Sequence, residues 1–189
     1  VTDTLTSRGG IADLRVATSY AFSPKLSVGG GIHFLTGSNR MATRRVWDDR
    51  DYSSLEEKAE LSYQAIGFSA GLLPHPTPKL GIAGSVRRDG RMTIQRDSTP
   101  SGEVAMPLQL AGGVRLQRSR RIAVAGQAIL RDWSKADSGL VANGAIGSRD
   151  TRELSGGVEL YSNSRRPSNK PLRLGVRYAE LPFLISPQG

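Results

Sequence analysis

Hydrophobic and polar residues alternate with a period of two along most of the chain. In residues 11–22, Leu14 and Val16 fall on one face and Asp13 and Arg15 on the other. This alternation is typical of a β-strand that has one apolar and one polar face. The pattern predicts an all-β chain without a convincing amphipathic helix.

Eight runs follow this pattern, and together they predict an antiparallel up-and-down meander of about eight strands over residues 1–189. The predicted strands cover residues 11–22, 26–36, 59–73, 79–94, 104–117, 122–132, 152–161 and 172–181. In the third run the apolar phase changes between Tyr63 and Ile66, which predicts a β-bulge near Ala65.

The connections between these runs alternate in length. The shorter set is 23–25, 74–78, 118–121 and 162–171, and the longer, more polar set is 37–58, 95–103 and 133–151. Short turns at one end and long loops at the other are typical of bacterial outer-membrane barrels. Lipid offers no hydrogen bonds, so such strands pair in a closed ring with an apolar outer face. A water-soluble antiparallel sandwich or barrel alternates as well and stays an alternative.

The turns also repeat one short pattern, a turn residue followed by a basic residue and an apolar/small alternation. It occurs at Ser23-Pro24-Lys25, Thr77-Pro78-Lys79, Ser119-Arg120-Arg121 and Asn169-Lys170-Pro171. Each copy opens a strand, which predicts repeated hairpins rather than a helical solenoid.

Composition narrows the chemistry. The chain has no cysteine and two histidines, so thiolate and multi-histidine metal sites are excluded, and we expect no metal and no cofactor. Lys and Arg exceed Asp and Glu by 26 to 17, a net charge of +9. The arginines are mostly scattered along the chain rather than gathered in one patch, and aromatic residues make up 6%. Both facts disfavour a nucleic-acid partner, which needs a basic patch and aromatic rings for base stacking. No residues converge as a catalytic set, so we do not expect an enzyme.

Arginine dominates the polar faces of the predicted strands. Arg115, Arg131, Arg173 and Arg177 are the candidates for a lumen wall that meets ligand, because guanidinium groups bind carboxylates through charge-assisted hydrogen bonds. The alternative is that these arginines pair with glutamates across the strands and fill the interior.

Two stretches resemble the outer-membrane long-chain fatty-acid and hydrocarbon transporter family (FadL-type). Residues 106–115 with 129–135 are similar to the family's Pro-leading strand and a returning strand that ends in Asp132-Trp133-Ser134. Residues 172–178, followed by Leu181-Pro182-Phe183, resemble the family's Arg-Gly-aromatic strand and its proline. The resemblance implies structural roles for Asp132, Trp133, Ser134 and Pro182.

The resemblance implies a channel in the bacterial outer membrane for passive uptake of long-chain fatty acids or other hydrophobic compounds, surrounded by lipid and lipopolysaccharide. The family barrel has more strands and an N-terminal hatch, so we expect either a fragment of a larger barrel or a divergent chain that closes with eight strands. Two other functions stay open. One is a structural or adhesive outer-membrane barrel without transport, and the other is a soluble basic β-domain that binds polyanions.

Overall fold

The computed structural model describes residues 1–47, 53–134, 136, 148–161 and 171–182. Within these ranges the ordered elements are all β-strands. No helix long and apolar enough to cross a membrane occurs among the described residues. The predicted connection 162–171 lies almost wholly outside them.

The strands are β1 (Thr2–Ser23), β2 (Leu26–Val46), β3 (Leu55–Pro74), β4 (Leu80–Asp89), β5 (Met92–Arg96), β6 (Thr99–Val104), β7 (Leu108–Gln117), β8 (Ile122–Arg131), β9 (Thr151–Leu160) and β10 (Leu172–Ala179). Neighbouring strands are antiparallel, in the order β1-β2-β3-β4-β7-β8-β9-β10, and β5 pairs with both β3 and β6. The prediction of an all-β meander of about eight strands is confirmed.

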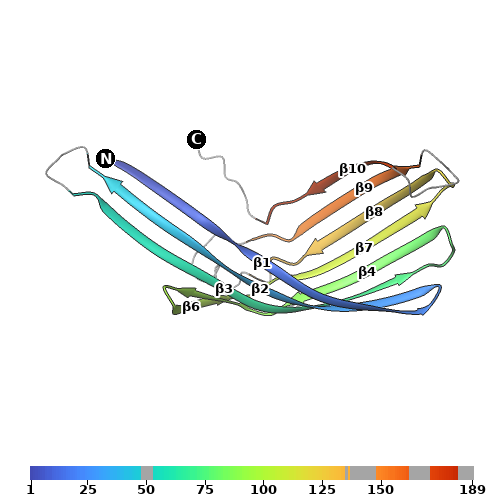
Figure 1. Ribbon diagram of the computed structural model, residues 1–189, viewed down its shortest axis with the longest axis horizontal. Helices are drawn as coiled ribbons and strands as arrows, with labels where there is room; N and C mark the ends of the chain where they lie inside the picture. Colours follow the sequence, from blue (N-terminus) through green and yellow to red (C-terminus); the bar gives the residue numbers. More distant parts are fainter. Residues whose placement is uncertain (48–52, 135, 137–147, 162–170, 183–189) are drawn as a thin grey trace.

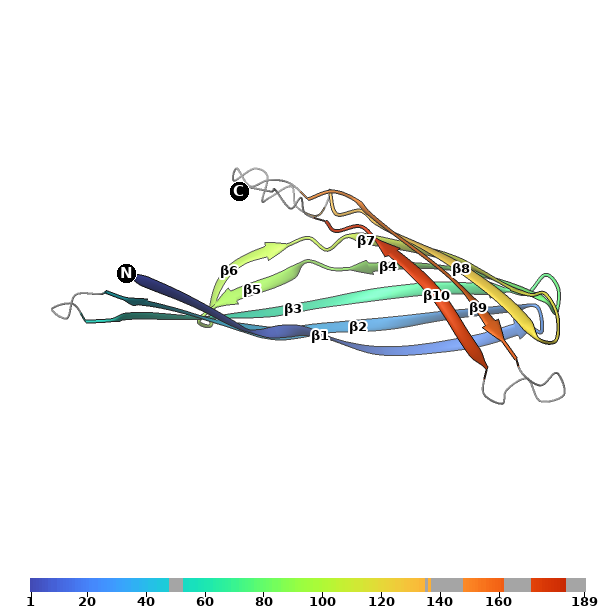
Figure 2. The same ribbon diagram turned by 90° about the horizontal axis from the view of Figure 1, so that it is seen from above.

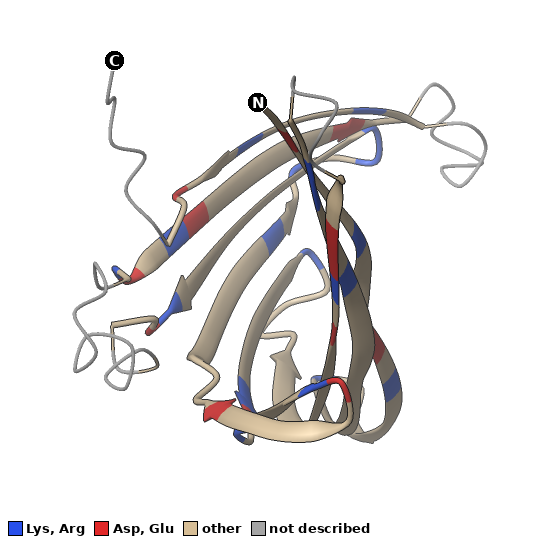
Figure 3. Cartoon of the chain, turned by 90° about the vertical axis from the view of Figure 1, so that its left-hand side faces the viewer, with Lys and Arg blue, Asp and Glu red and all other residues tan. Residues whose placement is uncertain are grey.

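The sheet curls into a half-barrel with a convex outer face and a concave inner face (Figures 1 and 3). Strands β1 and β10 form its two edges, and among the described residues they do not pair with each other. The β1–β2, β3–β4 and β7–β8 turns lie together at one end, on the right in Figure 1, and the opposite ends of these strands lie toward the left. We call these the short-turn end and the long-loop end.

Strands β1 and β2 are about twice as long as predicted, and β3 begins four residues earlier than predicted. The expected loop 37–58 is largely strand, since residues 37–46 pair with β1 and residues 37–45 pair with residues 55–63. Figure 2 shows this three-stranded extension reaching beyond the ends of β7 to β10 at the long-loop end. The prediction was wrong because polar cross-strand pairs, not apolar alternation, hold this part of the sheet.

Two ion pairs illustrate how the extension is held. Arg45 binds Asp3 at 2.7 Å and Arg40 binds Glu60 at 3.1 Å, each across neighbouring strands. The hydrogen bond from Arg45 lowers the pKa of the Asp3 carboxyl below its ordinary value. These pairs are exposed to solvent and each contributes little alone.

The predicted bulge near Ala65 is wrong. Strand β3 pairs with β2 from Leu55 to Pro74 without a shift in register. The change of phase marks a change of face, because Tyr63 and Ala65 point to the inner side, where they pack with Leu35 and Met92. Met92 is the first residue of β5, which pairs with β3 and with β6.

The predicted strands 79–94 and 104–117 are each interrupted. Strand β4 ends at Asp89, and β5 then pairs with the next part of β3 from Met92 onward. Strand β6 pairs with β5 and ends at Val104, before β7 begins. The expected loop 95–103 is a tight turn at Asp97 and Ser98, whose φ angles are 49° and 67°. Two successive left-handed residues twist a hairpin in the sense that antiparallel strands require.

Gly37 lies at a close approach of β1 and β2. A Cβ at this position would overlap the backbone carbonyl of Gly10 on the neighbouring strand. We expect Gly37→Val to separate the strands here and to lower the free energy of unfolding by about 1–3 kcal/mol. Urea unfolding in lipid vesicles measures this loss. Gly10→Val is the control, because nothing lies within 4 Å of a Cβ there, and an equal loss in both variants would contradict the explanation.

Candidate functional site

The convex face carries a continuous apolar belt, produced by strand register. Residues in one phase of each strand lie directly opposite one another across the whole sheet. One such row contains Tyr20, Val28, Leu72, Gly84, Gly112, Ala128, Leu154 and Tyr178. Its large members are well exposed, with Leu72 at 51% and Leu154 at 53%. A contiguous exposed surface of this kind marks contact with an apolar medium or a partner.

The belt ends at similar levels on neighbouring strands. Beyond its edge at the long-loop end the next outward residue is polar, as in Thr36, Gln64, Arg88 and Arg152. From Leu108 to Leu116 the outward positions of β7 are uninterrupted by polar residues, over nine of its ten residues. A tilted spanning strand needs ~9–11 residues. The belt therefore has the height that an outer-membrane strand requires.

The concave inner wall carries the polar residues of the opposite phase, and two glutamates organise its second half. Glu153 binds Arg177 at 2.7 Å and Arg131 at 3.3 Å, so one carboxylate on β9 joins β8 and β10. Gln109 on β7 extends the group, since Arg131 Nε donates to its side-chain oxygen at 3.1 Å. The Glu153 side chain is 10% exposed and that of Arg131 is 28% exposed, whereas Arg177 is 66% exposed.

A second triad lies closer to the short-turn end. Glu159 binds Arg173 at 2.7 Å and Arg115 at 3.2 Å. The Tyr161 hydroxyl donates to the same carboxylate at 2.6 Å. Each triad contains two guanidinium groups and one carboxylate, so each leaves one net positive charge on the inner wall.

The structure thus brings the four predicted arginines to the inner face and joins them in two pairs. Arg131 shares Glu153 with Arg177, and Arg115 shares Glu159 with Arg173. The arginine–glutamate pairing across strands, which was the alternative to ligand contact, is present in the structure. Their role toward a ligand stays a prediction, because a paired guanidinium keeps further N–H donors.

The first half of the inner wall has a third polar group, centred on His33. The imidazole is 1% exposed and lies between Asp13, at 3.2 Å from Nδ1, and the Ser69 hydroxyl, at 2.9 Å from Nε2. Arg87 binds Asp13 at 2.6 Å and Asp89 at 2.9 Å. Both ring nitrogens of His33 therefore have a side-chain hydrogen-bond partner.

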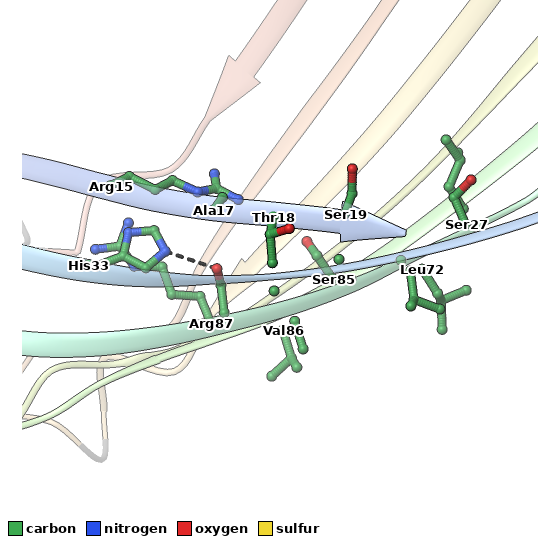
Figure 4. A pocket seen from close by; sticks show the side chains of 18 of the residues that line it. Arg15, Ala17, Thr18, Ser19, Ser27, His33, Leu72, Ser85, Val86 and Arg87 are labelled. Atoms are coloured by element: carbon green, nitrogen blue, oxygen red, sulfur yellow. Dashed lines mark hydrogen bonds between the residues drawn. The ribbon is translucent and has the colours of Figure 1, made fainter. Parts of the chain in front are cut away.

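Next to His33 the wall is hollowed by a groove of about 580 Å³. Small residues of β2 and β3, such as Gly29, Ser69 and Gly71, form much of its surface. Arg15 and His33 lie at one end of the groove and Ser27 at the other (Figure 4). This half of the wall is therefore recessed, because its inward positions carry few large side chains.

Sequence reasoning did not identify the residues that organise these groups. The alternation places Asp13, Glu153 and Glu159 on the polar strand faces. It does not predict their partners, because these depend on register and on strands far apart in sequence. No group of three or more metal-ligating side chains occurs in the described parts of the chain.

The residues that carry the family resemblance lie at the long-loop end. The backbone of Asp132 pairs with Leu108 directly after β8, and the Ser134 hydroxyl donates to the Asp132 carboxylate. The Pro182 carbonyl accepts from the backbone of Arg149, beyond β10. Lys135 and Phe183 lie outside the described residues. The structural roles of Asp132, Trp133, Ser134 and Pro182 stay predictions.

No family model matches the chain, and no curated protein matches it in sequence. Solved structures match over nearly its whole length. The toluene transporter TbuX of Ralstonia pickettii is 18% identical, with a TM-score of 0.63, over 92% of this chain and 56% of the transporter. A FadL homologue of Pseudomonas aeruginosa is 13% identical, with a TM-score of 0.65, over 97% of this chain and 52% of that one.

The CymD monoaromatic hydrocarbon channel is 18% identical, with a TM-score of 0.63, over 95% of this chain and 63% of the channel. This chain therefore spans between about half and two thirds of the length of the structures it matches. At these identities the similarity concerns the fold. The half-barrel has the fold of part of a FadL-type transporter barrel.

Proposed function

We propose that this chain is part of an outer-membrane barrel through which long-chain fatty acids or other hydrophobic compounds enter passively. In this role the barrel supplies a route and catalyses no reaction. The apolar belt faces the lipid, and lipopolysaccharide surrounds its long-loop end. Ligand passes along the inner wall.

One observation carries this proposal, the division of the sheet into an apolar outer face and a polar inner wall. A water-soluble sandwich buries its apolar face against a second sheet. Here the belt stays exposed on the convex side, and the paired charges lie on the concave side. This is the arrangement of a membrane barrel with a polar lumen. The fold shared with a toluene transporter and a monoaromatic hydrocarbon channel supports transport of hydrophobic molecules.

Uptake by the full-length gene product tests the proposal. Reconstituted liposomes that enclose a fatty-acid-binding fluorescent reporter should take up oleate faster than protein-free liposomes, and toluene uptake is measured in parallel. A folded barrel that accelerates neither compound would instead favour the structural or adhesive barrel, for which the protruding extension of β1 to β3 provides a surface.

The predicted lumen arginines are tested in the same assay. We expect Arg173→Ala combined with Arg177→Ala to slow uptake several-fold, because both guanidinium groups lie on the inner wall and position Glu159 and Glu153. Arg44→Ala is the control, since Arg44 lies in the extension, in the outward phase of β2. Unchanged uptake in the double variant would show that these arginines do not contribute to the route.

A further inference from the structure

The turns at the short-turn end form one continuous edge. The backbone carbonyl of Lys25 accepts from His75 at 2.7 Å, which joins the β1–β2 turn to the β3–β4 turn. The carbonyl of Lys79 accepts from Gln117 at 2.7 Å, and that of Arg121 accepts from Tyr161 at 2.8 Å. Each turn is thereby joined to its neighbour around the end of the half-barrel.

Basic side chains accumulate along this edge and acidic ones do not. The turn segments 23–25, 75–79 and 118–121 contain no aspartate or glutamate. Their cations are Lys25, Lys79, Arg118, Arg120 and Arg121, which we call the basic rim. All five are exposed, and none has a side-chain ion pair within the described residues. On the inner wall, by contrast, Arg115 and Arg173 share Glu159 and Arg131 and Arg177 share Glu153.

The basic rim borders the apolar belt directly. Lys25, Lys79 and Arg121 each immediately precede an outward apolar residue, namely Leu26, Leu80 and Ile122. At the same end the exposed rings of Tyr20 and Phe22 meet edge to face, with centroids 5.0 Å apart. Aromatic rings above an apolar band are typical of the membrane–water interface.

We propose that the basic rim binds the phosphate headgroups of anionic phospholipids in the leaflet at the short-turn end. A guanidinium or ammonium group at that depth meets the headgroup phosphates while the neighbouring apolar residue stays among the acyl chains. An acidic protein bound from the aqueous side would not need the belt and the aromatic rings at the same edge. This inference rests on the proposed membrane barrel, and the following experiment separates the two.

Tryptophan quenching by chain-brominated lipids is a local measure of which lipid contacts the rim. The full-length gene product carries Phe22→Trp, with Trp47→Phe and Trp133→Phe and any other tryptophan removed. It is reconstituted with brominated phosphatidylglycerol or brominated phosphatidylcholine at equal mole fraction. Quenching by brominated phosphatidylcholine alone reports membrane insertion, and the ratio of the two lipids reports selection by charge.

We expect phosphatidylglycerol to occupy the site beside the Phe22→Trp reporter at least twofold more than phosphatidylcholine. Neutralising the rim with glutamine at its five positions should return this ratio to one, and so should high salt. The double variant Lys25→Gln with Lys79→Gln should give an intermediate ratio. It replaces the variant with five substitutions if that variant does not fold. A reporter at Phe34→Trp, near the other edge of the belt, should not respond to either change.

Two outcomes are distinct failures. Equal quenching by both lipids with the rim intact would overturn the proposed lipid site and leave the membrane barrel standing, with an acidic protein as the next partner to test. No quenching by either lipid would overturn the membrane barrel and the lipid site together.

Discussion

We expect Val114→Arg to destabilise the protein by about 2–4 kcal/mol, the cost of a cationic side chain near the midplane on the lipid face of a barrel. Val114 is in the outward phase of β7 and is 48% exposed. Its neighbours in the same row, Ile82 and Gly126, belong to the apolar belt. Reversible urea unfolding of the full-length gene product in phospholipid vesicles measures the change.

The matched control is Ala111→Arg, on the same strand and in the opposite phase. Ala111 lies opposite Ser85 and Ile129 on the inner wall, where other arginines already lie. We expect less than about 1 kcal/mol of destabilisation from this change, because a lumen-facing charge keeps access to water. A larger loss for Ala111→Arg than for Val114→Arg would mean that the two faces have been assigned the wrong way round.

The second large effect concerns Glu153, the shared partner of Arg131 and Arg177. We expect Glu153→Gln to lower the free energy of unfolding by about 2–3 kcal/mol, because two guanidinium groups lose the carboxylate that balances them. Adding Arg177→Gln should recover part of this loss, since it removes one of the two uncompensated cations. Unfolding in vesicles, analysed as a double-mutant cycle, measures both.

Glu57→Gln is the control for the triad. Glu57 pairs with Arg96 at 3.4 Å, and both side chains are more than half exposed. Such a pair contributes less than about 1 kcal/mol. Equal losses from Glu153→Gln and Glu57→Gln would show that the Glu153 triad is no more than a surface ion pair.

The sequence allowed the fold to be predicted where one strand face is apolar. Strands β8, β9 and β10 lie close to their predicted places, because residues such as Ile122 to Leu130 and Leu172 to Tyr178 alternate regularly. The outer halves of β1 and β2 and the first four residues of β3 were missed, since pairing there rests on polar contacts such as Asp3 with Arg45. Period-two hydrophobicity carries no information about such strands.

The inner wall was predicted only in part, and for a physical reason. The phase of each strand placed Arg115, Arg131, Arg173 and Arg177 on the polar side. Which carboxylate each one meets depends on strand register, and a shift of one residue would send every side chain to the other face. The pairing of Arg87 with Asp13, 74 positions apart, is of this kind.

If the convex face lies in lipid and the concave face in water, spin labels at successive positions of β8 should alternate between the two environments. The chain has no cysteine, so once any cysteine elsewhere in the full-length gene product is replaced, a single cysteine can be introduced at each position from Ile122 to Arg131. With the full-length gene product in lipid vesicles, we expect labels at even-numbered positions to be accessible to oxygen and labels at odd-numbered positions to a polar nickel reagent. Accessibility without a period of two, or access of the polar reagent to Val124 and Ala128, would contradict this assignment of the two faces.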